Sequence, residues 1–170
     1  YLTDLLTDRT LETLDRRSED GKPWLISLHY TAPHWPWEGP DDRAEAERLD
    51  RSPDPRAILH YDGGSMETYA AMVKSLDTNI GRILEKLTEL GMAENTVVVF
   101  TSDNGGERFS DTWPFTGRKT ELLEGGLRIP AIVRWPGLAA PGTVSDAPIM
   151  SMDWLPTFVA AAQGPTDPAY

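Results

Sequence analysis

The chain has 170 residues and a formal net charge of −11, with 39% hydrophobic and 25% charged residues. This composition is ordinary for a globular domain with a real core, and no apolar run approaches the ~20 residues of a membrane span. The acidic excess argues against a broad nucleic-acid surface, because phosphate backbones are bound by clustered Lys and Arg. The sequence contains no cysteine, which excludes disulfides, zinc–thiolate sites and a cysteine nucleophile within it.

The first part of the chain carries a helix pattern, a strand pattern and a long loop. Leucines at helical spacing predict an amphipathic helix over residues 3–17. The apolar run 24–30 follows a turn and predicts a buried strand. Residues 31–64 are rich in Pro, Trp and Asp and predict a functional or mobile loop with a short helix over 41–51. The leucines of the first helix are Leu5, Leu6, Leu11 and Leu14.

The middle of the chain gives the clearest patterns. Apolar residues recur every three or four positions over 66–90, and Gly91 stands where a C-cap belongs, which predicts a long helix. The β-branched run 96–101 predicts a central parallel strand. A strand, a crossing helix and a second strand form a βαβ unit.

The last part of the chain predicts further strands and a helix. Residues 129–135 predict a strand and 147–151 a weaker one, followed by a helix over 153–162 with Pro156 in its first turn. The order of elements predicts one α/β domain over residues 1–170, layered α/β/α around a mostly parallel sheet. Ligands of such sheets bind beyond the carboxyl ends of the strands, where this sequence places polar clusters.

Asp103 and Asn104 follow the predicted central strand. Carboxylate and amide oxygens are the ligands that hard cations such as calcium or magnesium prefer, and Gly105 and Gly106 let the backbone bend around an ion. The alternative is a simple turn, since Asn-Gly is a common turn signal.

His34 lies between prolines and tryptophans at the end of the first predicted strand. A proline-fixed, indole-shielded imidazole suits a proton donor or an anion contact. Polar filling of a loop is the alternative reading. His29, within the strand pattern, and His60, in the loop, are predicted to be structural.

Lys119 lies in a cation-rich stretch that ends in a glycine pair. It suits a point charge for an anionic substrate, although, taken alone, a surface salt bridge with a nearby Glu is the favoured explanation. Glu124, with Gly125 and Gly126, predicts a tight turn whose side chain ties the loop down.

Together these clusters resemble the sulfatase family, in the alkaline-phosphatase superfamily. The matching pieces are Asp103-Asn104 in VVVFTSDNGG, Lys119 in RKTELLEGGLRIPAIVRWPG and His34 in APHWP, and YAAMVKSLDTNIGRILEKLTELGMAENTVVVFTSDNGG and SMDWLPTF also read like sulfatase sequence. The resemblance covers nearly the whole chain and is to the C-terminal part of the catalytic domain.

The resemblance implies a role for each candidate residue. Asp103 and Asn104 are expected to be two ligands of a divalent cation, usually calcium in this family. His34 is expected to contact the sulfate and to protonate the departing alcohol oxygen. Lys119 is expected to bind the sulfate and to help neutralise charge on the leaving oxygen. A metal with aimed cations suits charge that spreads over sulfonyl oxygens.

Parts of the family pattern are absent from this sequence. Family members use a formylglycine made from Cys or Ser in a Cys/Ser-x-Pro-x-Arg motif, which Ser52-Pro53 and Ser145 do not match. The family's N-terminal paired aspartates are also missing, and Asp41-Asp42 follow the histidine motif in the wrong order to replace them. The chain does not begin with Met and has no signal-peptide pattern. We expect a partial sulfatase catalytic domain without the nucleophile segment and the small C-terminal subdomain.

The predicted function is sulfate ester hydrolysis by the full-length protein, with the isolated chain inactive. The alternatives are a phosphonate or phosphate ester hydrolase of the same superfamily and a non-catalytic binding protein that keeps the fold. The expected substrate is a small sulfate ester or a sulfated sugar, with Trp35, Trp37 and Trp113 at the pocket mouth. Missing strands predict self-association or a companion N-terminal fragment. The compartment stays open, although many family members are exported.

Overall fold

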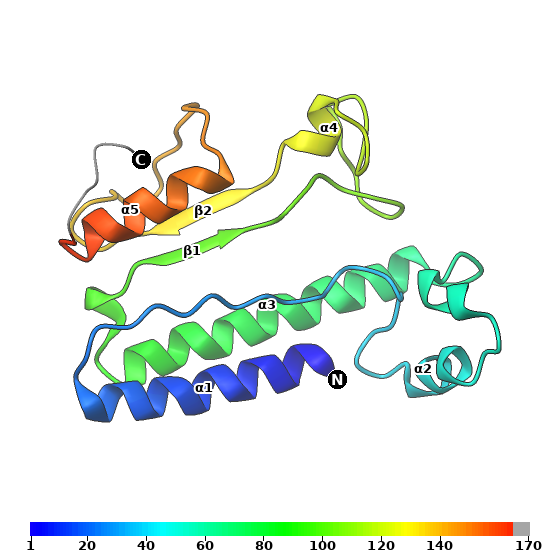
Figure 1. The fold of residues 1–170 in the computed structure, drawn as a ribbon, viewed down its shortest axis with the longest axis horizontal. Coiled ribbons are helices and arrows are strands. Elements are labelled where there is room, and N and C mark those ends of the chain that lie inside the picture. Colours follow the sequence, from blue (N-terminus) through cyan, green and yellow to red (C-terminus); the bar gives the residue numbers. More distant parts are fainter. Residues whose placement is uncertain (165–170) are drawn as a thin grey trace.

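The computed structural model describes residues 1–164, which form a helical layer and a short strand ladder (Figure 1). The helices are α1 (Leu2–Asp20), α2 (Arg43–Asp50), α3 (Met66–Glu89), α4 (Glu124–Leu127) and α5 (Trp154–Ala161). The strands are β1 (Val98–Thr101) and β2 (Ala131–Arg134). Short 3-10 turns are η1 (Pro55–Leu59), η2 (Ala93–Asn95) and η3 (Ser151–Asp153).

Helices α1 and α3 pack side by side along their length (Figure 1). The hydroxyl of Thr7 donates to the Thr3 carbonyl at 2.9 Å, so polar side chains are satisfied within the buried face of α1. Cross-helix polar pairs then fix the register of the two helices. They are Asn79 with Asp4 at 2.8 Å, Arg82 with Asp8 at 2.6 Å and Lys86 with Asp15 at 2.7 Å.

The predicted helix over 3–17 is confirmed, but its buried face differs from the leucine pattern. Leu14 is buried as expected, whereas Leu5 is 52% exposed. The buried residues of α1 are Thr3, Thr7, Thr10 and Leu14. The buried threonine hydroxyls are satisfied, because those of Thr7 and Thr10 donate to the carbonyls of Thr3 and Leu6 one turn earlier.

The predicted long helix is confirmed as α3, and its ends follow the sequence signals. Ser65 caps the N-terminus by accepting a hydrogen bond from the Thr68 amide at 3.0 Å. Gly91 follows the C-cap with a left-handed φ of 67°. The short helix expected within 41–51 is confirmed as α2, and the helix expected over 153–162 as α5.

Much of the apolar core lies under α3 and includes the start of the long loop. Trp37 is 3% exposed and packs against Met72 and Leu76 of the helix. Tyr69 and Phe109 cover this cluster from α3 and from the loop that follows β1. The tryptophan-rich loop is therefore anchored to the helical layer.

The mostly parallel sheet is not observed in residues 1–164. Strand β1 pairs with β2 in an antiparallel ladder, with Phe100 opposite Ile132, and no other ladder is described in this part of the chain. The predictions of strands over 24–30 and 147–151, and of the βαβ unit, are therefore wrong for the described structure. An apolar run indicates burial but not strand direction, and a strand requires a partner that the run itself cannot specify.

The segment 24–30 still has the side-chain alternation of a strand. Trp24, Ile26 and Leu28 are half-buried, while Leu25 and Ser27 between them are exposed. The backbone is thus extended with two distinct faces, as the sequence pattern predicts, but it has no ladder partner among the described residues. No helix within residues 1–164 is long and apolar enough to cross a membrane.

Candidate active site

The four candidate residues line one open cavity between the helical layer and the ladder. Its volume is about 2800 Å³, and His34, Asp103, Asn104 and Lys119 all contribute to its wall. His34 comes from the loop after residues 24–30, and the other three come from the loop that follows β1. The structure thus brings His34 and Lys119, which are 85 positions apart in the sequence, into contact at the wall of a cavity that Asp103 and Asn104 also line.

His34 and Lys119 are in direct contact. The Lys119 Nζ lies 2.7 Å from Nε2 of His34, and the His34 Nδ1 lies 2.8 Å from the Trp35 carbonyl oxygen. A carbonyl can only accept and an ammonium can only donate, so Nδ1 carries the hydrogen and Nε2 carries the lone pair. His34 is therefore neutral in this arrangement, and its Nε2 lone pair accepts a hydrogen bond from the Lys119 ammonium.

Glu107 and Trp35 complete the surroundings of Lys119, and sequence reasoning missed Glu107. The Glu107 Oε2 lies 3.3 Å from Nζ, and the Trp35 ring centroid lies 5.8 Å from the same atom. The available signal was an acidic residue directly after the Asp103-Asn104 cluster. The salt-bridge reading of Lys119 is therefore confirmed, because the ammonium pairs with a glutamate. Lys119 also lines the cavity, and its role toward an anionic substrate stays a prediction.

Interlocked glycine backbones hold Lys119 beside the loop that carries Asp103. The Lys119 amide donates to the Gly106 carbonyl at 2.8 Å, and the Gly105 amide donates to the Gly126 carbonyl at 2.8 Å. A Cβ added to Gly105 would lie 2.0 Å from the Gly125 carbonyl oxygen, so no larger residue fits. The glycines after Asn104 therefore serve close backbone approach, which explains them better than turn formation alone.

Glu124 begins helix α4 and does not form the predicted simple turn. Its carboxylate pairs with the guanidinium of Arg128, which also lies over the Phe115 ring at 4.7 Å from the centroid. The side chain therefore ties α4 to the loop that carries Lys119, as the sequence predicts, through an intermediate arginine.

Asp103 and Asn104 have the oxygen atoms that a hard cation prefers, but two residues are too few to coordinate it alone. They lie directly after β1, where the Ser102 hydroxyl is 3.5 Å from the Asp103 Oδ1 and from the Asn104 carbonyl oxygen. Within residues 1–164 no group of three or more His, Cys, Asp or Glu side chains is placed to hold a metal. Calcium takes about six to eight oxygen ligands, so this pair can supply only part of its coordination.

The other two histidines lie apart from the His34–Lys119 contact. His29 is exposed and bonds the Ser27 hydroxyl at 2.8 Å. His60 is 1% exposed and bonds the Trp37 amide and the Glu45 carboxylate. The prediction of a structural role is confirmed for the buried His60.

Comparison with solved structures supports the fold class. The crystal structure of Ps i-CgsB in complex with k-i-k-neocarrahexaose superposes with a TM-score of 0.82 and 29% identity. The match covers 98% of this chain and 35% of that chain. The chain therefore shares the fold of that protein over nearly its whole length, although only one antiparallel ladder is described within residues 1–164.

Sequence comparison defines the family. The Sulfatase family model matches residues 1–164. The uncharacterized sulfatase YdeN of Escherichia coli strain K12 is 33% identical over 168 residues, which is 95% of this chain and 28% of that protein. Arylsulfatase J of Mus musculus is 30% identical over 169 residues, which is 98% of this chain and 26% of that protein. The chain belongs to the sulfatase family, and it spans about a quarter of the length of these relatives.

Proposed function

We propose that the full-length protein hydrolyses sulfate esters, with Lys119 and His34 as the sulfate-binding and proton-donating residues. The observation that carries the proposal is the 2.7 Å contact between Lys119 Nζ and His34 Nε2 at the wall of the open cavity. The family membership of the chain supports the same reaction class. This sequence corresponds to the C-terminal part of the catalytic domain.

The charges at this contact suit an anionic substrate. An ammonium and a protonated imidazole repel each other, so His34 stays neutral while its Nε2 accepts from Lys119. A sulfate group inserted between them would take the Lys119 hydrogen bond and offset the second positive charge. His34 can then carry a proton on Nε2 and give it to the departing alcohol oxygen. Glu107 would release Lys119 to the substrate at the same step.

The remaining chemistry of the site is proposed to come from outside this sequence. Asp103 and Asn104 would be two ligands of a divalent cation, and calcium fits their oxygen atoms. The other ligands would be the family's N-terminal paired aspartates, and the nucleophile would be a formylglycine in a Cys/Ser-x-Pro-x-Arg motif, neither of which this sequence contains. A bound cation would neutralise charge on the sulfonyl oxygens. The isolated chain lacks the nucleophile and is therefore expected to be inactive.

The proposed substrate is a sulfated sugar. The similar structure of Ps i-CgsB holds a neocarrahexaose, which favours a sugar over a small aryl ester. Trp35 and Trp113 line the same cavity as His34, and indole faces suit the apolar faces of sugar rings. Trp37 also lines the cavity but is buried under α3, so it contributes to the core of the wall.

Activity of the full-length protein tests the proposal. Lys119→Met and His34→Asn should each lower kcat on a sulfated oligosaccharide by about 10²–10⁴-fold, the range for removing an electrostatic or proton-donating group. Lys74→Met is the matched control, because Lys74 is an exposed lysine on α3 away from the cavity wall. Released sulfate is measured by ion chromatography, and phosphate and phosphonate esters are assayed in parallel. Faster turnover of those esters would show that the protein is a phosphonate or phosphate ester hydrolase instead.

The isolated chain is also proposed to associate with itself or with a companion fragment. Strands β1 and β2 form the one ladder described in residues 1–164, so each has an outer edge without a partner there. Ile132 and Val133 of β2 are exposed, and such an edge pairs readily with another chain. Light scattering at high concentration measures this, and a monodisperse monomer would count against it.

A further inference from the structure

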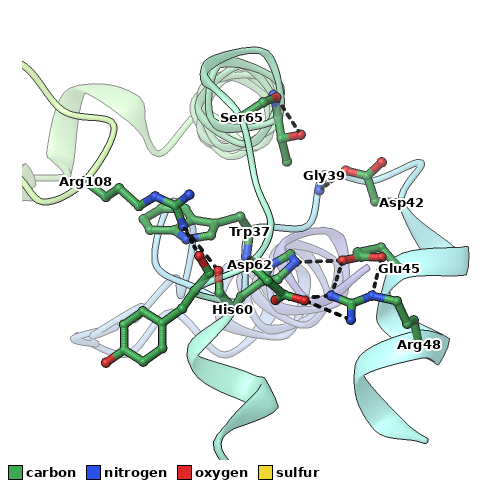
Figure 2. Close-up of polar contacts among 11 residues, drawn as sticks. Trp37, Gly39, Asp42, Glu45, Arg48, His60, Asp62, Ser65 and Arg108 are labelled. Atoms are coloured by element: carbon green, nitrogen blue, oxygen red, sulfur yellow. Dashed lines mark hydrogen bonds and ion pairs between the residues drawn. The ribbon is translucent and has the colours of Figure 1, made fainter. Parts of the chain in front are cut away.

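His60 lies outside the candidate active site but contacts both loops that carry its charged residues (Figure 2). We propose that His60 is a positioning residue that holds the loop bearing His34 in register with the loop bearing Lys119. This inference rests on the proposed function, because His34 and Lys119 are the groups whose placement matters. His60 is 1% exposed, so it acts through its neighbours and not on a substrate.

The imidazole of His60 joins the His34 loop to helix α2. The Trp37 amide donates to Nδ1 at 2.9 Å, and Nε2 lies 2.7 Å from the Glu45 Oε1. An amide N–H can only donate, so Nδ1 carries the lone pair and Nε2 carries the hydrogen that Glu45 accepts. His60 is therefore a neutral imidazole of the opposite tautomer to His34, and both of its nitrogens are used.

The Glu45 carboxylate is itself held in place. Arg48 donates to its two oxygens at 2.9 Å and 2.8 Å and also pairs with Asp62 at 3.2 Å (Figure 2). These hydrogen bonds from Arg48, aided by the one from His60, lower the pKa of Glu45 to about 2. The carboxylate thus stays ionised and keeps the hydrogen of His60 on Nε2.

The Trp37 amide is a rigid point on the loop that carries His34. The Trp37 indole is buried and meets the Phe109 ring edge-on, with centroids 4.9 Å apart. On the other side of the imidazole, a Cβ added to Gly63 would lie 1.8 Å from Nε2 of His60. The imidazole therefore lies close against the Gly63 backbone and also holds the Trp37 amide.

A second contact joins His60 to the loop that carries Lys119. The Arg108 guanidinium donates to the His60 carbonyl at 3.2 Å and lies over the Phe109 ring at 4.7 Å. The neighbouring residue Glu107 pairs with Lys119 at 3.3 Å. His60 is thus bonded on its side chain to one loop and on its backbone to the other, and the His34–Lys119 contact spans the two.

Two substitutions at His60 separate positioning from general stability. His60 has a left-handed φ of 52°, a region that Asn tolerates well, and an Asn oxygen can replace Nδ1 as acceptor for the Trp37 amide. Leucine fills the space but accepts nothing. In the full-length protein, His60→Asn should keep kcat within about threefold, whereas His60→Leu should lower kcat by about 10–100-fold with little change in KM, as expected for misplaced catalytic groups.

The choice of substrate adds a readout that a purely structural role would not move. A sugar alcohol needs the proton from His34 to depart, whereas 4-nitrophenolate departs without it. The loss in His60→Leu should therefore be at least about tenfold larger on a sulfated sugar than on 4-nitrophenyl sulfate. Equal losses on the two substrates would overturn the positioning role, and so would an unchanged kcat.

A matched pair on helix α2 controls for loss of charge. Glu45 and Glu47 both pair with arginines, but only Glu45 contacts His60. Glu45→Ala should reproduce part of the substrate-dependent loss, and Glu47→Ala should leave both rates unchanged. If His60→Leu does not fold, this pair and His60→Asn still test the proposal, and equal effects of the two glutamate changes would contradict it.

NMR of the imidazole nitrogens separates failure of this inference from failure of the proposed function. The chain has three histidines, so their ¹⁵N signals can be assigned by substitution. We expect an Nε2–H tautomer for His60 and an Nδ1–H tautomer for His34, with the His34 signals shifted in folded His60→Leu. Absence of sulfatase activity in the wild type would end the proposed function alone. Unchanged His34 signals in folded His60→Leu would overturn the positioning role alone.

Discussion

Residues 1–97, the helical half, and residues 98–164, the ladder half, are held in their folds by different means. In the helical half, large side chains such as Leu14, Trp37 and Met72 are buried between α1, α3 and the long loop. In the described ladder half, the buried residues are Gly105, Gly125 and Gly126. Side-chain burial therefore stabilises one half, and close backbone contact shapes the other.

The candidate active site takes its parts from both halves. His34 comes from the helical half, where the core fixes its loop through Trp37. Lys119, Asp103 and Asn104 come from the ladder half, where hydrogen-bonded glycine backbones set their spacing. The position of the His34 imidazole thus depends on hydrophobic packing. The position of the Lys119 ammonium depends on glycine backbones that pack closely because they carry no side chains.

The largest stability effect is expected in the helical half. Trp37→Ala should cost about 3–5 kcal/mol, because it empties a buried site against Phe109, Met72 and Leu76. The matched change Trp113→Ala removes an indole that is 83% exposed in the ladder half, and it should cost less than about 0.5 kcal/mol. Urea unfolding followed by circular dichroism measures both. Similar costs for the two substitutions would contradict the division between the halves.

The next effect tests the glycine contacts of the ladder half. Gly105→Ala should cost about 1–3 kcal/mol, because its Cβ would lie 2.0 Å from the Gly125 carbonyl oxygen, which cannot rotate away. Hydrogen exchange of the Lys119 amide should also speed up, since that amide bonds Gly106 in the same loop. The control is Gly81→Ala in α3, where nothing lies within 4 Å of the added Cβ. It should stabilise the chain by about 0.5–1 kcal/mol. An unchanged free energy of unfolding in Gly105→Ala would show that the loop has room to adjust.

The contrast between the halves also explains which features the sequence could predict. Helices α1, α2, α3 and α5 were found because their periodicity and caps are local signals. The strand over 24–30 and the parallel sheet were not observed, because ladder partners are long-range and no local pattern specifies them. The run 24–30 nonetheless keeps its predicted alternation of half-buried and exposed side chains.

The candidate site shows the same limit. The resemblance to sulfatases pointed to His34 and Lys119, which the structure places 2.7 Å apart. The pairing of Glu107 with Lys119, and the links from His60 to Trp37 and Glu45, had no pattern of their own in the sequence. The paired residues are 12 to 23 positions apart in the sequence, and only folding brings them into contact.

A smaller effect concerns the pH dependence of the helical half. Arg48 lowers the pKa of Glu45 from 4.5 to about 2, so the contribution of this carboxylate is complete above pH 4.5 and is lost as the pH falls toward 2. Glu45→Gln should cost roughly 1 kcal/mol at pH 7, since the carboxylate is partly exposed and solvent weakens the ion pair. The difference from wild type should shrink below pH 4.5 in acid-dependent unfolding. Glu47→Gln is the control, and an equal effect there would remove the special role of Glu45.

The smallest effect is expected from calcium added to the isolated chain. Asp103 and Asn104 supply two side-chain ligands in the ladder half, whereas calcium prefers about six to eight oxygen ligands. With a Kd near ~1 mM, 1 mM calcium would stabilise the chain by only about 0.4 kcal/mol. Asp103→Ala should abolish even that shift, whereas Asp111→Ala, in the loop beyond Gly106, should not. Calorimetric titration measures the affinity directly. A submicromolar Kd would mean that this half builds a complete cation site by itself, because two ligands cannot offset the dehydration of the ion.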